Sequence, residues 1–405
     1  MELSNEENIT TTSDVYKNQL NGLMTITEAI NENASISQLF DIYQSAIRKY
    51  YNPSVISLCI NTIQGMQLYS SDPTRKWEDY VTLYQKFSRK KSSYLRSSTN
   101  EVYIPVYHKK QLIALVHLQD MIHWPRIELE FLKTMTNFVA IAIENKRLFK
   151  QRIEQENYRT QLALARQIQH SLMPHHFADS RELEFKTLYI PHSQIGGDYF
   201  DFFHIKNSHV SIFCIADVAG KGIPAALLMA NLQASLRRLS INYVNLEFLL
   251  NGLNKAVFES TKGDRLVTIF LAAYDVVKNE LQYINAGHPY PILQTKNQGS
   301  RFLKKGTTPI GISESLPEVS IGTEIIQDET VIFAYTDGLE ELRNGHGQMM
   351  GHHQILSTLH QLPFGEIEMI TDTIEEFIEK FKGNEPIGDD ITVLLCKIKP
   401  DGIVQ

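Results

Sequence analysis

The pattern of apolar and polar positions changes along the chain. Up to about residue 120, segments with apolar residues at helical spacing alternate with short runs that resemble strands. The helical segments are 15–31, 36–50 and 73–89, and the strand-like runs are 54–60, 66–69, 101–107 and 111–118. The last two runs flank His108-Lys109-Lys110, which predicts a hairpin. The whole pattern predicts a compact α/β module.

A long helix is predicted from Arg126 to Leu172, because this stretch lacks proline and glycine and is rich in helix formers. Pro174 ends the pattern. In its polar second part, apolar residues fall on two heptad positions, which are Ile141, Leu148 and Leu162 on one and Tyr158, Ala165 and Leu172 on the other. Glutamate and glutamine interrupt this seam. The pattern fits a solvated connecting helix or a marginal two-stranded coiled coil.

From about residue 182 onward, short strand-like runs dominate, with few helical segments between them. The predicted strands are 185–190, 198–205, 210–216, 266–274, 281–285, 331–336 and 391–397, and the predicted helices are 223–239, 246–259 and 367–381. Strands of this length interrupted by so few helices are typical of an antiparallel β-sandwich flanked by helices. The predicted fold class is therefore α+β.

Aspartates stand at the ends of several of these apolar runs. Asp217 follows one run, Asp337 follows another, and Asp389 with Asp390 precedes the last one. Asp198 follows two glycines. Carboxylates at the ends of buried strands cost free energy unless a positive charge offsets them. Several such carboxylates without histidine or cysteine favour Mg²⁺ or Mn²⁺ over zinc.

The composition is ordinary for a globular protein of two domains, with 405 residues, 43% hydrophobic residues and a formal charge of −7. The negative charge argues against general nucleic-acid binding. The three cysteines lie in apolar runs and are expected to be buried thiols. No signal peptide or membrane-spanning run is visible, so we expect a cytoplasmic protein.

Seven short motifs follow one another in a fixed order through the second half. They read IQHSLMP (168–174), IGGDYFD (195–201), DVAGKGIPA (217–225), NAGHPYP (285–291), GTTPIG (306–311), YTDGLEE (335–341) and DDIT (389–392). Together they resemble the SpoIIE/RsbU branch of the metal-dependent protein phosphatase 2C family. Ala219, Thr308 and Ile310 depart from that branch's usual pattern without touching a proposed ligand.

The resemblance implies a centre of two Mn²⁺ or Mg²⁺ ions. Asp217 would bridge both ions and the carbonyl of Val218 would bind one of them, with Asp337 and Asp389 completing the site. Asp198 would support the ions directly or through water. Asp198 and Asp217 are accordingly the expected catalytic residues, and the spacing alone leaves Asp389 and Asp390 as alternatives for one ligand position.

Other polar residues of these motifs have a plainer interpretation. Lys221 could hold phosphate or be a solvated loop lysine. His288 is expected to be a loop histidine satisfied by local hydrogen bonds, and Asp201 to serve a turn or to support the site. The pairs His175-His176 and His352-His353 would point apart on a strand, which disfavours metal binding.

The N-terminal module resembles a GAF domain through its hairpin and the exit helix FVAIAIENKRLFKQ (138–151). The predicted organisation is a disordered tail (1–14), a GAF-like sensor (15–145), a linker helix (146–175) and a phosphatase domain (176–400). A small ligand or an activating partner is expected to act on the GAF-like module. Its identity stays open.

The resemblance predicts a protein serine/threonine phosphatase that acts on a phosphorylated STAS-type anti-sigma-factor antagonist. A homodimer formed through the linker helix is expected to transmit the signal. One alternative is a signalling scaffold with the same fold and little or no turnover. Another is a diguanylate cyclase, because IGGDYF is close to the GG[DE]EF hairpin, although that reading leaves YTDG and DDIT unexplained.

Overall fold

The structure is a computed structural model that divides into two compact units, Met1–Asn157 and Tyr158–Gln405. The described residues are 17, 19–62, 65–89, 95–96, 100–108, 111–120, 128–174, 181–192, 195–296, 299–361, 364 and 366–400. The predicted tail at 1–14 and the pair His175-His176 lie outside them. Each unit is described by itself, and the predicted domain bounds stay predictions.

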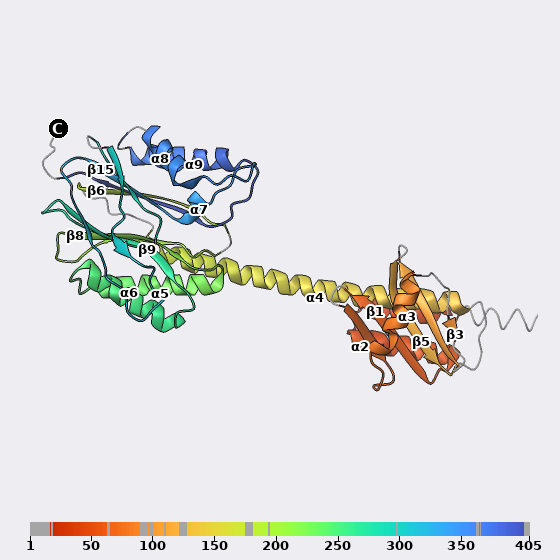
Figure 1. Cartoon of the computed structure of the whole chain (residues 1–405). Coiled ribbons are helices and arrows are strands. Elements are labelled where there is room, and N and C mark those ends of the chain that lie inside the picture. The colour runs from red at the N-terminus through yellow and green to blue at the C-terminus, as the bar shows by residue number, and fades with distance from the viewer. Residues whose placement is uncertain are drawn as a thin grey trace, which may run out of the picture. The chain divides into compact units, whose positions relative to one another are not determined.

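The first unit is built on one antiparallel sheet with helices packed against it (Figure 1). Its elements are a helix at 19–31, α2 (Ile36–Tyr51), β1 (Val55–Thr62), β2 (Gly65–Ser70), α3 (Glu78–Arg89), β3 (Leu95–Arg96), β4 (Glu101–His108) and β5 (Gln111–Gln119). The strand order is β2-β1-β5-β4-β3. The predicted hairpin is the β4–β5 pair.

Each face of this sheet carries its own apolar cluster. On one face, Tyr43 of α2 packs with strand residues such as Val116 and with Met135 of the long helix. On the other face, the ring of Tyr80 on α3 packs against Cys59 and its neighbours. All three cysteines of the chain are buried and free, as predicted.

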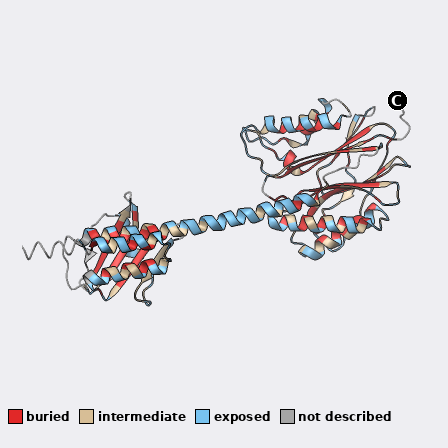
Figure 2. Ribbon diagram, turned by 180° about the vertical axis from the view of Figure 1, so that it is seen from behind, coloured by how far each residue is buried: buried red, intermediate tan, exposed pale blue. Residues whose placement is uncertain are grey.

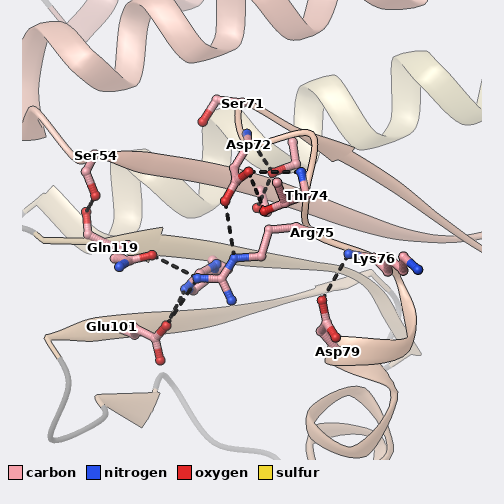
Figure 3. A network of polar contacts seen from close by, with 12 residues as sticks. Ser54, Ser71, Asp72, Thr74, Arg75, Lys76, Asp79, Glu101 and Gln119 are labelled. Carbon is pink, nitrogen blue, oxygen red and sulfur yellow. Dashed lines mark hydrogen bonds and ion pairs between the residues drawn. The ribbon is translucent and has the colours of Figure 1, made fainter.

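The helix predicted to begin at Pro73 begins only at Glu78, because the residues before it form a polar turn (Figure 3). Asp72 accepts hydrogen bonds from the backbone and the hydroxyl of Thr74. The guanidinium of Arg75 donates to Gln119 at 2.9 Å and lies 3.6 Å from Glu101. The Asp72–Thr74 bonds hold the segment in a non-helical conformation, and the contacts of Arg75 attach it to the sheet.

The predicted long helix is present as α4 (Glu128–Leu172), and residues 121–127 before it lie outside the described part. Up to Ile143 its apolar side chains are largely buried. Between 151 and 168 almost every residue is exposed (Figure 2). Leu162 and Ala165, both on the predicted seam, are half-buried. The helix is confirmed, and pairing of the seam stays a prediction.

The second unit contains two sheets and five further helices among its described residues (Figure 1). The strands are β6 (Leu183–Ile190), β7 (Tyr199–His204), β8 (Val210–Val218), β9 (Val267–Asp275), β10 (Glu280–Ala286), β11 (Ile292–Thr295), β12 (Gly299–Phe302), β13 (Gly306–Thr307), β14 (Gly322–Ile325), β15 (Thr330–Tyr335) and β16 (Ile391–Ile398). The helices are α5 (Ile223–Ser240), α6 (Leu246–Thr261), α7 (Asp337–Glu340), α8 (Gly351–Gln361) and α9 (Ile367–Lys382).

The two sheets form the predicted sandwich. One has the order β13-β10-β9-β8-β7, with β14 on β10, and the other has the order β12-β11-β15-β16-β6. Nearly all pairings are antiparallel; β10 and β13 run parallel. Phe213 and Phe270 from one sheet and Leu394 from the other belong to one buried cluster between the layers. Helices α5 and α6 cover one outer face, while α8 and α9 cover the other (Figure 1).

Two further local predictions were wrong. Strand β8 continues through Asp217 to Val218, because Asp217 still pairs with Thr268 of β9. Helix α8 was not predicted, so His352 and His353 lie on a helix with ring centroids 4.2 Å apart rather than on opposite sides of a strand.

Asp201 serves neither a turn nor the carboxylate site. It lies within β7, fully buried, and accepts a hydrogen bond from Nε of Arg237 on α5 at 2.7 Å. The second guanidinium nitrogen and the hydroxyl of Tyr199 also donate to it. This carboxylate therefore ties α5 to the sheet that carries Asp217.

We expect Asp201→Asn to destabilise the second unit by about 3 kcal/mol, because it leaves a charged guanidinium without its buried partner. Urea unfolding followed by circular dichroism measures this loss. Both tryptophans, Trp77 and Trp124, belong to the first unit, so the fluorescence transition should not move. Glu259→Gln, which removes an exposed pair with Lys255, should cost less than about 0.5 kcal/mol. Equal losses in both variants would contradict the anchoring role.

Candidate metal-binding site

The aspartates predicted from the motifs converge at one edge of the sandwich. Asp217 is the penultimate residue of β8, Asp337 is the first residue of α7, and Asp389 lies two residues before β16 begins. Burial, together with the nearby charges of Asp337 and Asp389, raises the pKa of Asp217 to about 7. Carboxylates that raise one another's pKa in this way must lie close together.

Asp198 is the most deeply buried carboxylate of the group. One of its oxygens accepts hydrogen bonds from the hydroxyls of Thr336 at 2.9 Å and Thr392 at 2.5 Å. Burial raises its pKa well above the ordinary value, and the nearby charge of Asp217 adds to the effect. The TDG and DDIT motifs thus supply threonines that orient Asp198, a role that the sequence did not reveal.

The structure separates the roles of Asp389 and Asp390. Asp390 accepts hydrogen bonds from the backbone amides of His192 at 2.7 Å and Gly197 at 3.1 Å, one on each carboxylate oxygen. Asp389 is partly exposed and forms an ion pair with Lys221 at 2.9 Å. Asp390 therefore holds loops together, whereas Asp389 is the carboxylate open to a cation.

The two glycines before Asp198 leave room for this arrangement. A Cβ atom on Gly196 would lie 2.2 Å from an oxygen of Asp390. One on Gly197 would lie 2.8 Å from the carbonyl oxygen of Val218 and 3.4 Å from a carboxylate oxygen of Asp217. The Gly-Gly pair thus lets three oxygen-bearing groups approach one backbone segment.

This donor set fits a hard cation. Carboxylates and a backbone carbonyl are the ligands that Mg²⁺ and Mn²⁺ prefer, and the raised pKa values show that negative charge at this edge lacks compensation. The described residues contain no group of three or more acidic, histidine or cysteine side chains already arranged to hold a metal ion. The ammonium group of Lys221 engages Asp389 and the carbonyl of Gly388.

The end of α4 also reaches this region. The side-chain amide of Gln169 is buried and donates to the carbonyl of Gly196 at 2.8 Å. Met173, just beyond the helix, is buried in the same apolar cluster as Met229 of α5. Gln169 interrupts the predicted seam and belongs to the IQHSLMP motif, and neither pattern shows what its polar side chain contacts.

His288 differs from its prediction. It is 3% exposed, and only its Nδ1 has a side-chain partner, the hydroxyl of Thr268 at 3.1 Å. Its Nε2 is buried without a hydrogen-bond partner among the described residues. Burial lowers the pKa of His288 to about 3, so its ring is neutral. The residue lines a cavity that also includes Asp337.

Comparison with known families supports the assignment suggested by the motifs. Residues 207–399 match the family model described as stage II sporulation protein E (SpoIIE). The C-terminal part of this chain is therefore similar to a SpoIIE domain. The matched range contains Asp217, Asp337 and Asp389, while Asp198 lies just before it.

Relatives of the chain include named phosphatases. Phosphoserine phosphatase RsbU of Bacillus subtilis is 26% identical over 273 residues, which is 66% of this chain and 78% of that protein. Protein IcfG of a Synechocystis strain is 24% identical over 286 residues, 64% of this chain and 44% of IcfG. The chain therefore spans less than half of IcfG. Together with the family match, these relatives show a similarity to phosphatases of the SpoIIE/RsbU type.

A solved structure shows the same fold. The SiaA-PP2C domain of Pseudomonas aeruginosa matches with a TM-score of 0.53 and 18% identity, over 61% of this chain and 99% of that domain. This likeness confirms the predicted protein phosphatase 2C-like sandwich. In the described part of the chain, no helix has the length and apolar character needed to span a membrane.

We expect Lys221→Gln to raise the affinity of the full-length protein for Mn²⁺ by about two- to fivefold, because the lysine competes with the ion for Asp389 and such exposed pairs contribute up to about 1 kcal/mol. Isothermal titration calorimetry measures the change. Lys255→Gln, which removes an exposed lysine of α6, is the matched control and should bind as the wild type does. Weaker binding by Lys221→Gln would mean that the lysine supports the site instead.

Proposed function

We propose that this protein removes phosphate from serine or threonine of a partner protein and that two Mn²⁺ or Mg²⁺ ions serve the reaction. The observation that carries the proposal is the cluster formed by Asp217, Asp337 and Asp389 within a domain similar to SpoIIE. When bound, such ions lower the pKa of water and offset charge on the phosphoryl oxygens.

The residues of the chain would divide the work as follows. Asp217 would bridge the ions and the carbonyl of Val218 would bind one of them, with Asp337 and Asp389 completing the site. Asp198 would orient water from its position between Thr336 and Thr392. Its two hydroxyl donors fix the carboxylate in one orientation, which is what positioning a water molecule requires.

The proposed substrate is a phosphorylated STAS-type anti-sigma-factor antagonist. The support is the resemblance of the motifs and the relationship to RsbU, whose name records a phosphoserine phosphatase. The proposed regulator is the N-terminal module, with a GAF-like fold and a small ligand or partner protein as its signal. Its sheet and two covered faces are compatible with such a module.

The proposed route of regulation is a homodimer formed through α4. Beyond Ile143, six large apolar side chains of this helix are more than one-third exposed, which is costly unless another surface covers them. They are Leu148, Phe149, Ile153, Tyr158, Leu164 and Ile168. A second copy of the same helix is an occupant that the interrupted heptad pattern fits.

We expect Asp217→Asn and Asp389→Asn each to lower phosphatase activity by about 100-fold or more, because each removes a proposed metal ligand. The assay measures phosphate release from a panel of phosphorylated STAS domains, with Mn²⁺ and with a chelator. Asp372→Asn changes an exposed aspartate of α9 and should leave activity unchanged.

Asp390→Asn tests whether Asp390 has a structural role, through its melting temperature measured beside the activity assay. It should lower the melting temperature, because it weakens two bonds from backbone amides. Asp389→Asn should leave the melting temperature of the metal-free protein nearly unchanged. If the wild type binds the phosphoproteins but releases no phosphate with any metal, the scaffold alternative is correct. Full activity of Asp217→Asn would contradict the metal assignment.

We expect the double variant Leu148→Lys, Leu162→Lys to weaken self-association of the full chain by at least about tenfold, because two charges would enter the proposed seam. Sedimentation velocity across a concentration series measures this. Leu164→Lys with Ile168→Lys tests a different stripe of the same helix, and Gln155→Lys controls for added charge. Loss of association only with Leu164 and Ile168 would show that the helices pair through that other stripe.

A further inference from the structure

Two adjoining hollows lie beside the carboxylate cluster, on the side formed by the NAGHPYP and GTTPIG motifs. The first has a volume of about 430 Å³ and includes Asp337 in its wall. The second has a volume of about 390 Å³. The two hollows share four residues, which are Gly287, His288, Tyr290 and Lys304. A peptide segment bound at Asp337 could therefore continue from the first hollow into the second.

Two polar atoms in these walls have no hydrogen-bond partner in the described structure. One is Nε2 of His288, which lines both hollows, and the other is the hydroxyl of Thr307 in the second. His288 is held rigidly, because its amide donates to Asn285 at 2.8 Å and its Nδ1 contacts Thr268. A buried polar atom without a partner is destabilising, so a ligand group that bonds to it would gain affinity.

The charge of the second hollow is positive. Lys304 and Lys305 both line it, together with the hydroxyls of Thr307 and Ser320, and none of its described lining residues is acidic. Lys304 lies over the rings of Tyr290 and Phe302, at 5.6 and 5.7 Å from their centroids. Among the described residues, neither lysine forms an ion pair with a carboxylate. Cations and free hydroxyls around one hollow suit an anionic oxygen ligand.

The packing of the two motifs explains only part of this arrangement. Strands β10 and β13 run parallel here, with Asn285 beside Gly306 and Ala286 beside Thr307. That pairing accounts for the small residues and for the asparagine. It does not explain why Nε2 of His288 and the hydroxyl of Thr307 lack hydrogen-bond partners, or why the two lysines lack ion pairs.

We propose that the second hollow binds an acidic side chain of the phosphoprotein substrate, a few residues away from the phosphorylated serine or threonine. This inference rests on the proposed phosphatase function. The phosphoryl group itself belongs at the carboxylate cluster, where cations can receive it. The aromatic walls of the first hollow would hold the intervening residues, and Lys304, Lys305 and Thr307 would receive the carboxylate.

The test compares two phosphoserine peptide sets that differ only by aspartate or asparagine at flanking positions. The wild type should show a higher kcat/KM for the aspartate set. Lys304→Met with Lys305→Met should lower the ratio of the two kcat/KM values by about tenfold, which corresponds to about 1.4 kcal/mol, because it removes both charged donors from the hollow. Thr307→Val, which keeps the side-chain volume, should lower the ratio in the same direction by a smaller factor.

Lys296→Met is the matched control, because this exposed lysine pairs with Glu329 on another part of the sandwich. It should preserve the wild-type ratio. Melting temperatures identify a variant that fails to fold. If the lysine double variant fails to fold, the comparison uses Thr307→Val. A wild type without preference for aspartate, or an unchanged ratio in the lysine and threonine variants, would overturn the proposal.

A failure of the proposed function remains distinguishable from a failure of this inference. If the wild type hydrolyses neither peptide set, fluorescence anisotropy with the labelled peptides measures binding instead. Tighter binding of the aspartate set that is lost in the lysine double variant would support the hollow without catalysis. Equal binding of both sets by the wild type would overturn it.

Discussion

Mutual repulsion among aspartates at one edge of the sandwich is the constraint on which the second unit depends. Asp217 has a pKa of about 7 because burial and neighbouring carboxylates disfavour its charge. The surrounding contacts offset that cost in different ways. Two threonine hydroxyls bind Asp198, two backbone amides bind Asp390, and Lys221 pairs with Asp389. The negative charges of Asp217 and Asp337 are offset least by these contacts, so a bound cation would stabilise these two carboxylates most.

Much of this was accessible from the sequence, because strands and metal-site motifs leave local signals. Alternating and continuous apolar runs predicted the strands, and aspartates at their ends predicted the site. Helix α8 was missed because its sequence, GHHQILSTLHQ, has few apolar positions and begins with glycine. The start of α3 was misplaced because the Asp72–Thr74 turn competes with a helix, which propensity alone does not reveal.

The contacts that the sequence could not supply are those between residues far apart in the chain. Spacing left Asp389 and Asp390 equivalent, and only their partners from residues 192, 197 and 221 distinguish them. Asp201 looked like one more residue of the GGDYFD motif, yet its partner is Arg237 on α5. His288 looked like a satisfied loop residue because nothing in NAGHPYP indicates that its Nε2 is buried without a partner. Tertiary pairing decides such cases, and a single sequence contains no record of it.

The last turn of α4 connects these observations to regulation. Gln169 donates to the carbonyl of Gly196, and the next residue, Gly197, donates through its amide to Asp390 and lies against the carbonyl of Val218. A small rotation of the helix end would therefore move the backbone segment that separates Asp198 from the proposed ligands. Because Gly196 and Gly197 have no room for even a Cβ atom, that movement cannot be absorbed locally. One hydrogen bond and a tightly packed glycine pair thus join the end of α4 to the carboxylates.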